Sequence, residues 1–254
     1  MEQKGMFSDL NPNTYNDFYK KNLKTVFLAI PSNYFYLRAD ISAFVLNQGL
    51  CPLNPYMNFD YNLLNTIPKK ITRIANNNLI KKSDELWVFC EDPEKLTDGV
   101  LFEIYLANKE NKKIKYFLIP DFKELKINLQ GSKEHYGNEL LNEDWKIVYT
   151  AMSSKLFYYR NFISKFALDN KVIPLNPFTS FDYFLADKTN RNSILLANSR
   201  FIELADELWS FGKLSDGIQA EIKLVKSIGK KVRYFKTDKK NIIEIKEEDA
   251  ELEN

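Results

Sequence analysis

Two short segments carry the same set of residues that could do chemistry. Residues 98–103 and residues 216–221 both read Asp-Gly-x-x-x-Glu, and they end at Glu103 and Glu221. An aspartate at a helix start can cap the helix, and the glycine permits a tight turn or the close approach of a ligand. The positive end of the helix then keeps a carboxylate in its second turn ionised, which suits a nucleophile. The alternative is that each glutamate merely complements the helix dipole.

Both segments belong to an internal duplication that covers most of the chain. Residues 52–55 and 174–177 both read Pro-Leu-Asn-Pro, and residues 84–87 and 206–209 both read Asp-Glu-Leu-Trp. Self-similarity of this extent predicts two copies of one fold. Two copies form a pseudo-dimer rather than a solenoid, and we expect a pseudo-twofold axis to relate them.

Each copy has the pattern of alternating strands and helices. In the first copy, residues 25–30 form a short apolar run, and residues 38–49 have helical spacing that ends at a glycine. Unbroken apolar strands joined by helices are typical of a parallel sheet that is covered on both faces. We therefore predict an α/β fold: two tandem three-layer α/β/α domains with parallel, flavodoxin-like sheets, arranged as a pseudo-dimer.

The repeat and the local composition define five segments. These are an N-terminal extension (1–23), a first α/β domain (24–128), a linker (129–145), a second α/β domain (146–245) and an acidic C-terminal tail (246–254). The linker is richer in Gly, Asn and charged residues than its flanks. At roughly 100 residues, each half has the size of a single domain.

Composition argues against several classes of function. Lys and Arg number 36 against 34 Asp and Glu, so the net charge of +2 gives no footprint for a nucleic acid polymer or an anionic membrane. No apolar run approaches the ~20 residues that span a bilayer, and the first residues lack the apolar core of a signal peptide. We therefore expect a cytoplasmic protein that does not bind a membrane.

The cysteines and the histidine limit the chemistry further. Cys51 and Cys90 align with Ile173 and Gly212 of the other copy, so neither belongs to a shared disulfide framework. The single histidine, His135, excludes a metal site that needs several imidazoles, and it excludes a Ser-His or Cys-His dyad within a repeat. We expect no metal and no cofactor, so that carboxylates, hydroxyls, amides and Arg perform any chemistry.

The position of each residue relative to the strands separates structural from functional candidates. Ligands of doubly wound sheets bind beyond the carboxyl ends of the strands. Asp84 and Asp206 precede their strands, so we expect them to be structural. The residues expected to converge on the ligand side are Ser32, Tyr36, Arg38, Asn54, Asp98, Gly99 and Glu103 in the first copy, and Ser154, Tyr158, Arg160, Asn176, Asp216, Gly217 and Glu221 in the second.

Some of these side chains allow two interpretations. Arg38 and Arg160, each near a serine, can grip a phosphate or carboxylate, because the guanidinium group suits bidentate anion binding. Alternatively, each arginine forms an ion pair on a helix surface. We expect Tyr36 and Tyr158 to lie in the core or to line a pocket. Trp87 and Trp209, within strands, are expected in the core.

The order of elements resembles a known family. An apolar strand, a loop, a glycine with a glutamate four residues on, a helix and the segment GKKV at 229–232 resemble the nucleoside 2-deoxyribosyltransferases and related nucleotide N-glycosidases. The resemblance extends over most of each repeat, although its motifs are short. It implies that Glu103 and Glu221 attack the anomeric carbon of a sugar. It also implies that a tyrosine on the first strand orients the glutamate. The matching residues are Phe27 and Tyr149, so only the second copy has this hydroxyl.

The chain departs from that family at two places. The family's aspartate that contacts the nucleobase is replaced by Asn76 and Asn198, and an amide can hydrogen-bond a base edge but cannot deliver a proton. The loop after the first strand, where the family usually has glycine, reads AIPSNYFYLR in one copy and AMSSKLFYYR in the other.

Three functions remain open from the sequence. The first is an N-glycosidase or deoxyribosyltransferase that acts on a nucleoside, a nucleotide or a nucleotide-derived metabolite through a glutamyl-sugar intermediate. The second is a catalytically silent nucleotide-binding sensor or scaffold, and the third is a structural pseudo-dimer without a ligand. A homo-oligomer also remains open. If the chain is an enzyme, Glu103 and Glu221 should face pockets at the carboxyl edges of their sheets, and the second copy should be the better catalyst.

Overall fold

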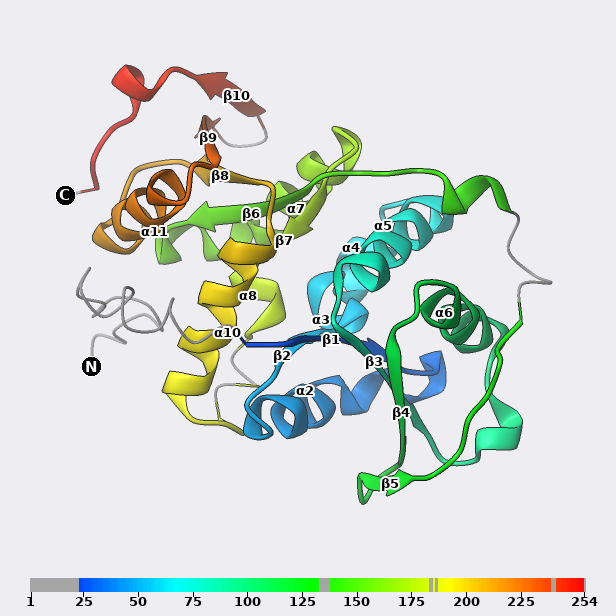
Figure 1. Cartoon of the computed structure of the whole chain (residues 1–254). Coiled ribbons are helices and arrows are strands. Elements are labelled where there is room, and N and C mark those ends of the chain that lie inside the picture. The colour runs from blue at the N-terminus through cyan, green and yellow to red at the C-terminus, as the bar shows by residue number, and fades with distance from the viewer. Residues whose placement is uncertain (1–22, 133–137, 183–184, 186, 239–240, 254) are drawn as a thin grey trace. The chain divides into compact units, whose positions relative to one another are not determined.

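The described residues form an α/β fold with two five-stranded sheets, one in each half of the chain (Figure 1). The structure, a computed structural model, describes residues 23–132, 138–182, 185, 187–238 and 241–253. Most of the predicted N-terminal extension and His135 lie outside the described residues. The described residues group into an N-terminal unit, Leu23–Trp145 with Phe181–Ala197, and a C-terminal unit, Lys146–Ser180 with residues 198–253.

The N-terminal unit has a sheet of order β2-β1-β3-β4-β5. Strands β1 to β4 pair in parallel, and β5 pairs with β4 in the antiparallel sense. Its elements are β1 (Thr25–Ala29), η1 (Ser32–Leu37), α2 (Arg38–Asn47), β2 (Cys51–Leu53), α3 (Pro55–Asn58), α4 (Tyr61–Leu64), α5 (Lys69–Lys82), β3 (Glu85–Cys90), η2 (Pro93–Lys95), α6 (Asp98–Lys109), β4 (Lys113–Leu118), β5 (Lys123–Leu125) and η3 (Asn138–Leu141).

The C-terminal unit repeats this topology in the order β7-β6-β8-β9-β10. Strands β6 to β9 are parallel, and β10 is antiparallel to β9. Its elements are β6 (Ile147–Met152), η4 (Ser154–Tyr159), α7 (Arg160–Asp169), β7 (Ile173–Leu175), α8 (Pro177–Ser180), β8 (Glu207–Phe211), α11 (Asp216–Ser227), β9 (Lys231–Asp238), β10 (Asn241–Ile245) and η5 (Glu247–Asp249). Helix α10 (Arg191–Leu204) begins in the N-terminal unit and ends in the C-terminal unit.

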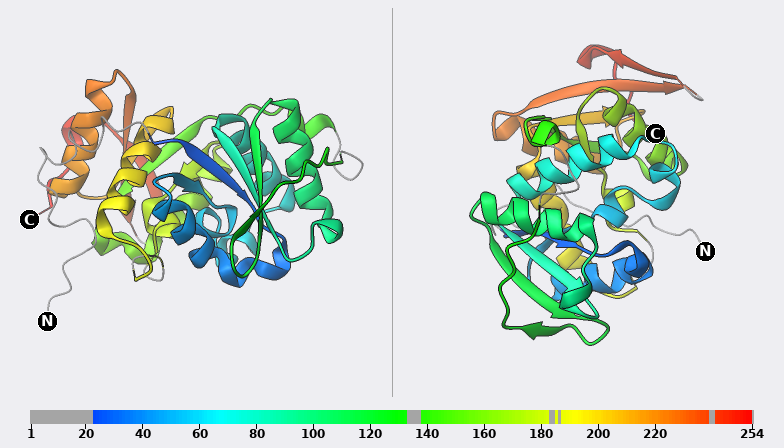
Figure 2. Two further views of the ribbon diagram at one scale, coloured as in Figure 1. Left: turned by 60° about the horizontal axis from the view of Figure 1, so that its bottom comes forward. Right: turned by 90° about the vertical axis from the view of Figure 1, so that its right-hand side faces the viewer.

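The fifth strand of each sheet corrects the prediction of purely parallel sheets. Residues between β4 and β5, and between β9 and β10, are too few for a crossover helix. A short connection can join only antiparallel neighbours, so each sheet is mixed. The hairpin of β9 and β10 is seen in orange and red in Figure 2.

Apolar side chains cover both faces of the central strands. All residues of β1, β3, β6 and β8 are buried, and successive side chains of a strand point to opposite faces. The core predicted for Trp87 and Trp209 is confirmed, because each packs in an aromatic and aliphatic cluster on one face of its sheet. Each indole Nε1 also donates a hydrogen bond to a glutamate two residues earlier, at 2.9 Å in β3 and 3.2 Å in β8.

The structural role predicted for Asp84 and Asp206 is confirmed. Oδ2 of Asp84 accepts hydrogen bonds from the backbone N–H of Thr25 at 2.7 Å and from its hydroxyl at 2.8 Å. Oδ2 of Asp206 accepts from the backbone N–H of Ile147 at 2.8 Å. Each aspartate therefore fixes the start of the first strand of its sheet, at the end opposite to the expected ligand side.

A segment from the second copy of the repeat belongs to the N-terminal unit. Residues 181–197 group with Leu23–Trp145. Lys188 Nζ lies 2.6 Å from Oδ1 of Asp40, and the hydroxyl of Thr189 donates to Oδ1 of Asn47 at 2.9 Å. Both partners are in α2, so these polar contacts fix the segment beside that helix.

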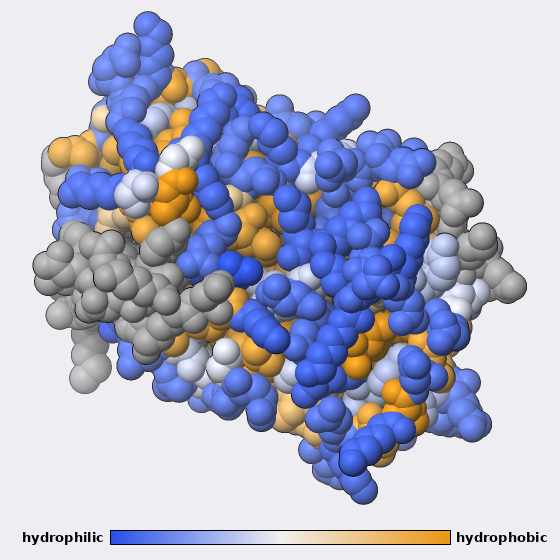
Figure 3. Space-filling view, in the orientation of Figure 1, coloured by the Kyte–Doolittle hydropathy of each residue, from blue (hydrophilic) through white to orange (hydrophobic). Residues whose placement is uncertain are grey.

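Polar residues dominate the visible surface. Hydrophilic residues cover most of the face seen in Figure 3, and apolar residues form smaller areas between them. Among the described residues, no helix is both long enough and apolar enough to cross a membrane. Cys51 and Cys90 are both buried, and neither forms a disulfide.

Candidate functional site

Glu221 belongs to a buried polar cluster in the C-terminal unit. Glu221 is only 6% exposed to solvent, and Tyr149 and Asn198 are 0% exposed. The hydroxyl of Tyr149 donates to Oε1 of Glu221 at 2.6 Å, and Nδ2 of Asn198 lies 3.4 Å from the same oxygen. The Tyr149 hydroxyl is also 3.0 Å from Oδ1 of Asn198. The contact predicted between Tyr149 and Glu221 is therefore confirmed, and one oxygen of the carboxylate is held from two sides.

Three elements bring this cluster together. Tyr149 lies in β6. Its neighbour Val148 packs with α7 on one face of the sheet, so the side chain of Tyr149 points to the opposite face. Asn198 comes from α10, and Glu221 lies in the second turn of α11. The buried residues of α11 recur at helical spacing, at Ile218, Glu221, Ile222 and Val225, so the glutamate is on the apolar face of its helix.

The matching positions of the N-terminal unit lack the hydroxyl. Helix α6, which carries Glu103, packs against β1 and α5, which carry Phe27 and Asn76. Oδ1 of Asn76 is buried and has no hydrogen-bond partner among the described residues. Burial raises the pKa of Glu103 to about 8. At neutral pH this carboxyl group is therefore mostly protonated, and a protonated carboxyl group is a poor nucleophile.

At a second aromatic position the tyrosine is in the first copy and the phenylalanine is in the second. Burial, and after it the charge of Glu103, raise the pKa of Tyr56 to about 12. The residue that aligns with Tyr56 is Phe178. One copy therefore combines Phe27 with Tyr56, and the other combines Tyr149 with Phe178. The sequence analysis missed this exchange, although each residue directly follows the repeated Pro-Leu-Asn-Pro.

The aspartates of the Asp-Gly motif do not cap their helices. Helices α6 and α11 begin at Asp98 and Asp216, and their capping residues are Thr97 and Ser215. The Ser215 side chain accepts from a backbone N–H of the first turn at 3.5 Å. The expected aspartate caps are therefore wrong. Both aspartates are exposed in the first turn, where their charge complements the helix dipole.

The glycines of the motif have an ordinary helical position. Gly99 and Gly217 are the second residues of α6 and α11, and neither is among the described glycines with positive φ. Gly212, the first residue after β8, has a φ of +74°. A Cβ there would lie 2.6 Å from Cδ1 of Leu156, so the tight turn after β8 depends on Gly212 rather than on Gly217.

Asn54 and Asn176 have structural contacts that are the same in both copies. Nδ2 of Asn54 donates to the carbonyl of Arg38 at 3.0 Å and to the hydroxyl of Ser42 at 2.9 Å. Nδ2 of Asn176 donates to the equivalent carbonyl and hydroxyl, both at 3.2 Å. Each Oδ1 accepts from a backbone N–H two residues on, at 3.0 Å. These side chains use their hydrogen-bonding groups to fix a turn, not to bind a ligand.

The two arginines contact their own preceding turns. Nη1 of Arg38 lies 3.4 Å from the carbonyl oxygen of Phe35, and Nη1 of Arg160 lies 3.1 Å from that of Phe157. Each guanidinium group also lies over the ring of that phenylalanine, at 5.7 Å and 4.1 Å from its centre. Neither guanidinium group forms an ion pair in the described part of the chain, and anion binding by these arginines stays a prediction.

The remaining candidates of the first loops are exposed. Ser32 and Ser154 begin η1 and η4 and face solvent. Tyr36 is 59% exposed and Tyr158 is 90% exposed, so the core position expected for them is wrong. Tyr36 does line a cavity of about 250 Å³, together with Glu91 and other residues of the N-terminal unit.

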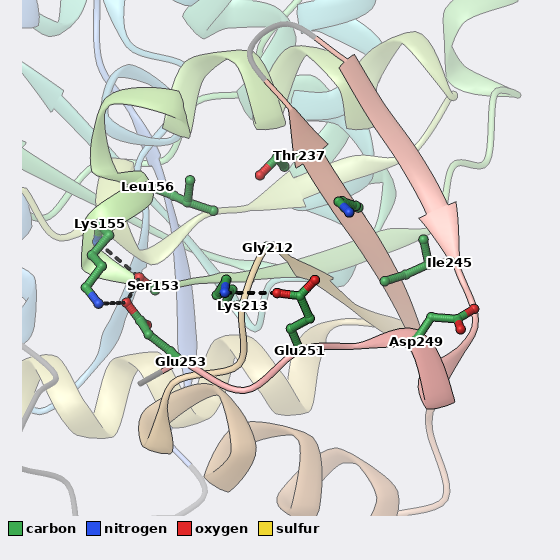
Figure 4. A pocket seen from close by; sticks show the side chains of 11 residues that line it. Ser153, Lys155, Leu156, Gly212, Lys213, Thr237, Ile245, Asp249, Glu251 and Glu253 are labelled. Carbon is green, nitrogen blue, oxygen red and sulfur yellow. Dashed lines mark hydrogen bonds and ion pairs between the residues drawn. The ribbon is translucent and has the colours of Figure 1, made fainter.

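A larger cavity lies at the carboxyl edge of the C-terminal sheet, where the sequence predicted a ligand. Its volume is about 440 Å³, and its walls include Ser153, Lys155, Gly212 and Lys213 (Figure 4). Glu221 does not line it. These residues are neighbours of the predicted ones, and the lysine at 155 is specific to the second copy, where the first has Asn33. In the parts of the chain that the structure describes, no cluster of His, Cys, Asp and Glu could hold a metal ion.

Comparison with known families gives one match. The profile of a domain of unknown function (DUF7768) matches residues 149–235. The matched region begins at Tyr149 and includes Asn198 and Glu221. No curated protein and no solved structure matches this chain.

Proposed function

We propose that the C-terminal unit is an N-glycosidase or deoxyribosyltransferase with Glu221 as its nucleophile. The observation that supports this most directly is the Tyr149 hydroxyl, 2.6 Å from Oε1 of Glu221. This hydrogen bond fixes the orientation of the carboxyl group before attack. The predicted resemblance to the deoxyribosyltransferases gives the same two residues these roles.

The reaction would proceed through a covalent sugar ester. A carboxylate oxygen of Glu221 attacks the anomeric carbon, the bond from carbon to the base nitrogen breaks, and the electron pair leaves with the base. Water then cleaves the ester in a hydrolase, whereas a second base cleaves it in a transferase. Asn198 can hydrogen-bond the base but cannot supply a proton, so the leaving base takes its proton from solvent.

The N-terminal unit would contribute no turnover of its own. Burial raises the pKa of Glu103 to about 8, and Phe27 cannot donate a hydrogen bond to it. The proposed reaction requires a nucleophile that is ionised and correctly oriented, and Glu103 meets neither requirement. The substrate is a small-molecule nucleoside, nucleotide or derived metabolite in the cytoplasm, and the chemistry needs no cofactor.

We also propose a more detailed assignment of the fold of the two units. We regard each unit as a three-layer, flavodoxin-like domain, and the pair of units as a pseudo-dimer. The shared order of the first four strands, 2-1-3-4, supports the flavodoxin-like assignment. Further support comes from the N-terminal unit, where α2 and α6 lie on opposite sides of the sheet in Figures 1 and 2.

Base release measures this function directly. The protein is incubated with a panel of ribo- and deoxyribonucleosides and their 5′-monophosphates, and free base is quantified by chromatography. Glu221→Gln should abolish most of the release, and the matched variant Glu103→Gln should retain most of it. An equal loss in both variants, or a greater loss in Glu103→Gln, would contradict the assignment.

A nucleotide-binding sensor is the second candidate. The near-complete burial of Glu221 favours it, because a nucleophile must reach its substrate. In that case the panel would give measurable binding without release of base, and Glu221→Gln would change affinity rather than turnover.

A further inference from the structure

The acidic tail forms one side of the cavity at the carboxyl edge of the C-terminal sheet. Its residues 247–253 follow β10 and contain η5. The cavity of about 440 Å³ lies between the ends of β6, β8 and β9 on one side and this tail on the other (Figure 4). Because ligands of α/β sheets bind at this edge, the tail occupies a position where a ligand is expected.

The charges of the cavity are divided between its two sides. The body of the unit supplies Lys155, Lys213 and Lys236, and the acidic tail supplies carboxylates that include Glu251 and Glu253. Without the tail, the cavity would present three ammonium groups and the Ser153 hydroxyl to solvent. Such a group of donors attracts a small anion.

The tail carboxylates are paired individually with these donors. Oε2 of Glu251 lies 2.9 Å from Nζ of Lys213, and Oε1 of Glu253 lies 2.8 Å from Nζ of Lys155. The Ser153 hydroxyl donates to Glu253 at 3.1 Å. The hydrogen bond and charge of Lys213, together with the charge of Lys236, lower the pKa of Glu251 below its usual range. The carboxylates therefore make the contacts that an anionic ligand would make.

The attachment of the tail is weak enough to be displaced. Its backbone joins the body through one parallel bridge, in which Leu214 N–H donates to the carbonyl of Glu251 at 2.8 Å and Glu253 N–H donates to the carbonyl of Leu214 at 3.0 Å. Leu252, between them, is 59% exposed and buries little apolar surface. The pair of Glu251 with Lys213 is exposed on both sides, so it contributes little and salt screens it, whereas the Glu253 side chain is only 12% exposed.

We propose that this cavity binds a phosphate-bearing small molecule through Ser153, Lys155 and Lys213, and that Glu251 and Glu253 of the acidic tail occupy the site until the ligand displaces them. A phosphate monoester carries close to two negative charges at neutral pH and accepts several hydrogen bonds, as the two carboxylates together do. The acidic tail is thus an autoinhibitory element. This inference goes beyond the proposed function, since it holds whether or not Glu221 cleaves a glycosidic bond.

The test compares affinity for inorganic pyrophosphate by titration calorimetry at constant ionic strength. The variant Glu251→Gln/Glu253→Gln removes the competing charges without shortening the chain, and it should bind about tenfold more tightly than the wild type. Adding Lys213→Ala to that variant should remove the gain. The matched control is Glu247→Gln/Glu248→Gln, which removes the same charge from the tail. Glu247 pairs with Lys226 and Glu248 with Lys246, and neither glutamate lines the cavity.

Two results would overturn the proposal. One is an equal gain in affinity for the control, which would show a general effect of net charge. The other is the absence of pyrophosphate binding to Glu251→Gln/Glu253→Gln, with a melting curve like that of the wild type. If the double variant melts early, the single variant Glu251→Gln replaces it, because that side chain is largely exposed, and a failure to gain affinity is then equally decisive.

Discussion

The hydroxyl of Tyr149 lies 2.6 Å from Oε1 of Glu221 and donates a hydrogen bond to it. At the matching positions, Phe27 offers Glu103 no donor, and burial raises the pKa of Glu103 to about 8. Glu221 therefore has a buried hydrogen-bond donor that Phe27 cannot give to Glu103. Four predictions test how these contacts affect the pKa of Glu103, the stability of the protein and its activity.

Phe27→Tyr should give Glu103 the missing donor. Because a hydrogen bond to the charged form favours ionisation, we expect the pKa of Glu103 to fall from about 8 to below about 7. The new hydroxyl also offers a donor to the buried Oδ1 of Asn76. The measurement is a pH titration by ¹³C NMR of glutamate carboxylates, with the Glu103 signal identified by its loss in Glu103→Gln. A pKa that stays near its wild-type value would show that burial alone controls this group.

Glu103 should also make stability depend on pH. An unfolded glutamate has a pKa of about 4.3, so between that pH and about 8 the folded protein keeps a proton that the unfolded chain has released. The free energy of unfolding therefore falls as the pH rises through this window and levels off above it. The total is up to about 5 kcal/mol, at about 1.4 kcal/mol per pH unit.

The matched variant for this prediction is Glu103→Gln, which cannot ionise. Its stability relative to the wild type should improve steadily from about pH 5 to about pH 8 in urea unfolding experiments. Parallel stability profiles of the two proteins would be inconsistent with a raised pKa at this position.

Asp84 should matter for stability and not for activity. Its carboxylate accepts two hydrogen bonds from buried Thr25, so Asp84→Ala should lower the free energy of unfolding by about 1–2 kcal/mol. The control is Asp121→Ala, which removes an exposed carboxylate between β4 and β5 and should change little. Both variants should keep wild-type base release. A selective loss of activity in Asp84→Ala would place this residue at the functional site instead.

The repeat allowed two α/β halves with parallel central strands to be predicted, but not the edges of the two sheets. The central strands are unbroken apolar runs, which the sequence shows directly. β5 (KEL) and β10 (NIIEI) are short, partly exposed edge strands, and their antiparallel direction depends on short connections that an apolar pattern does not reveal.

The site was predictable where the sequence motif itself defines the contact. The contact between Tyr149 and Glu221 was predicted because the resemblance to the deoxyribosyltransferases implies it, and the hydrogen bond is present. The local bonds of Arg38 and Arg160 were not, because a 3₁₀ turn offers each guanidinium a carbonyl oxygen that the sequence does not reveal. The pairing of the acidic tail with the cavity lysines likewise depends on tertiary structure.

The exchange of tyrosine and phenylalanine between the copies allows the last prediction. Tyr149→Phe should lower kcat for base release by ~10²-fold with little change in KM, because the hydroxyl orients Glu221 and does not bind the substrate. The double variant Tyr149→Phe/Phe178→Tyr reproduces the pair Phe27 and Tyr56 of the N-terminal unit. In that unit burial raises the pKa of Glu103 to about 8 in the presence of Tyr56, so we expect the double variant to stay inactive. Phe178→Tyr alone is the control and should retain activity. Recovery of kcat in the double variant would show that a hydroxyl at either position suffices, and the N-terminal unit would then have to be regarded as a second active site.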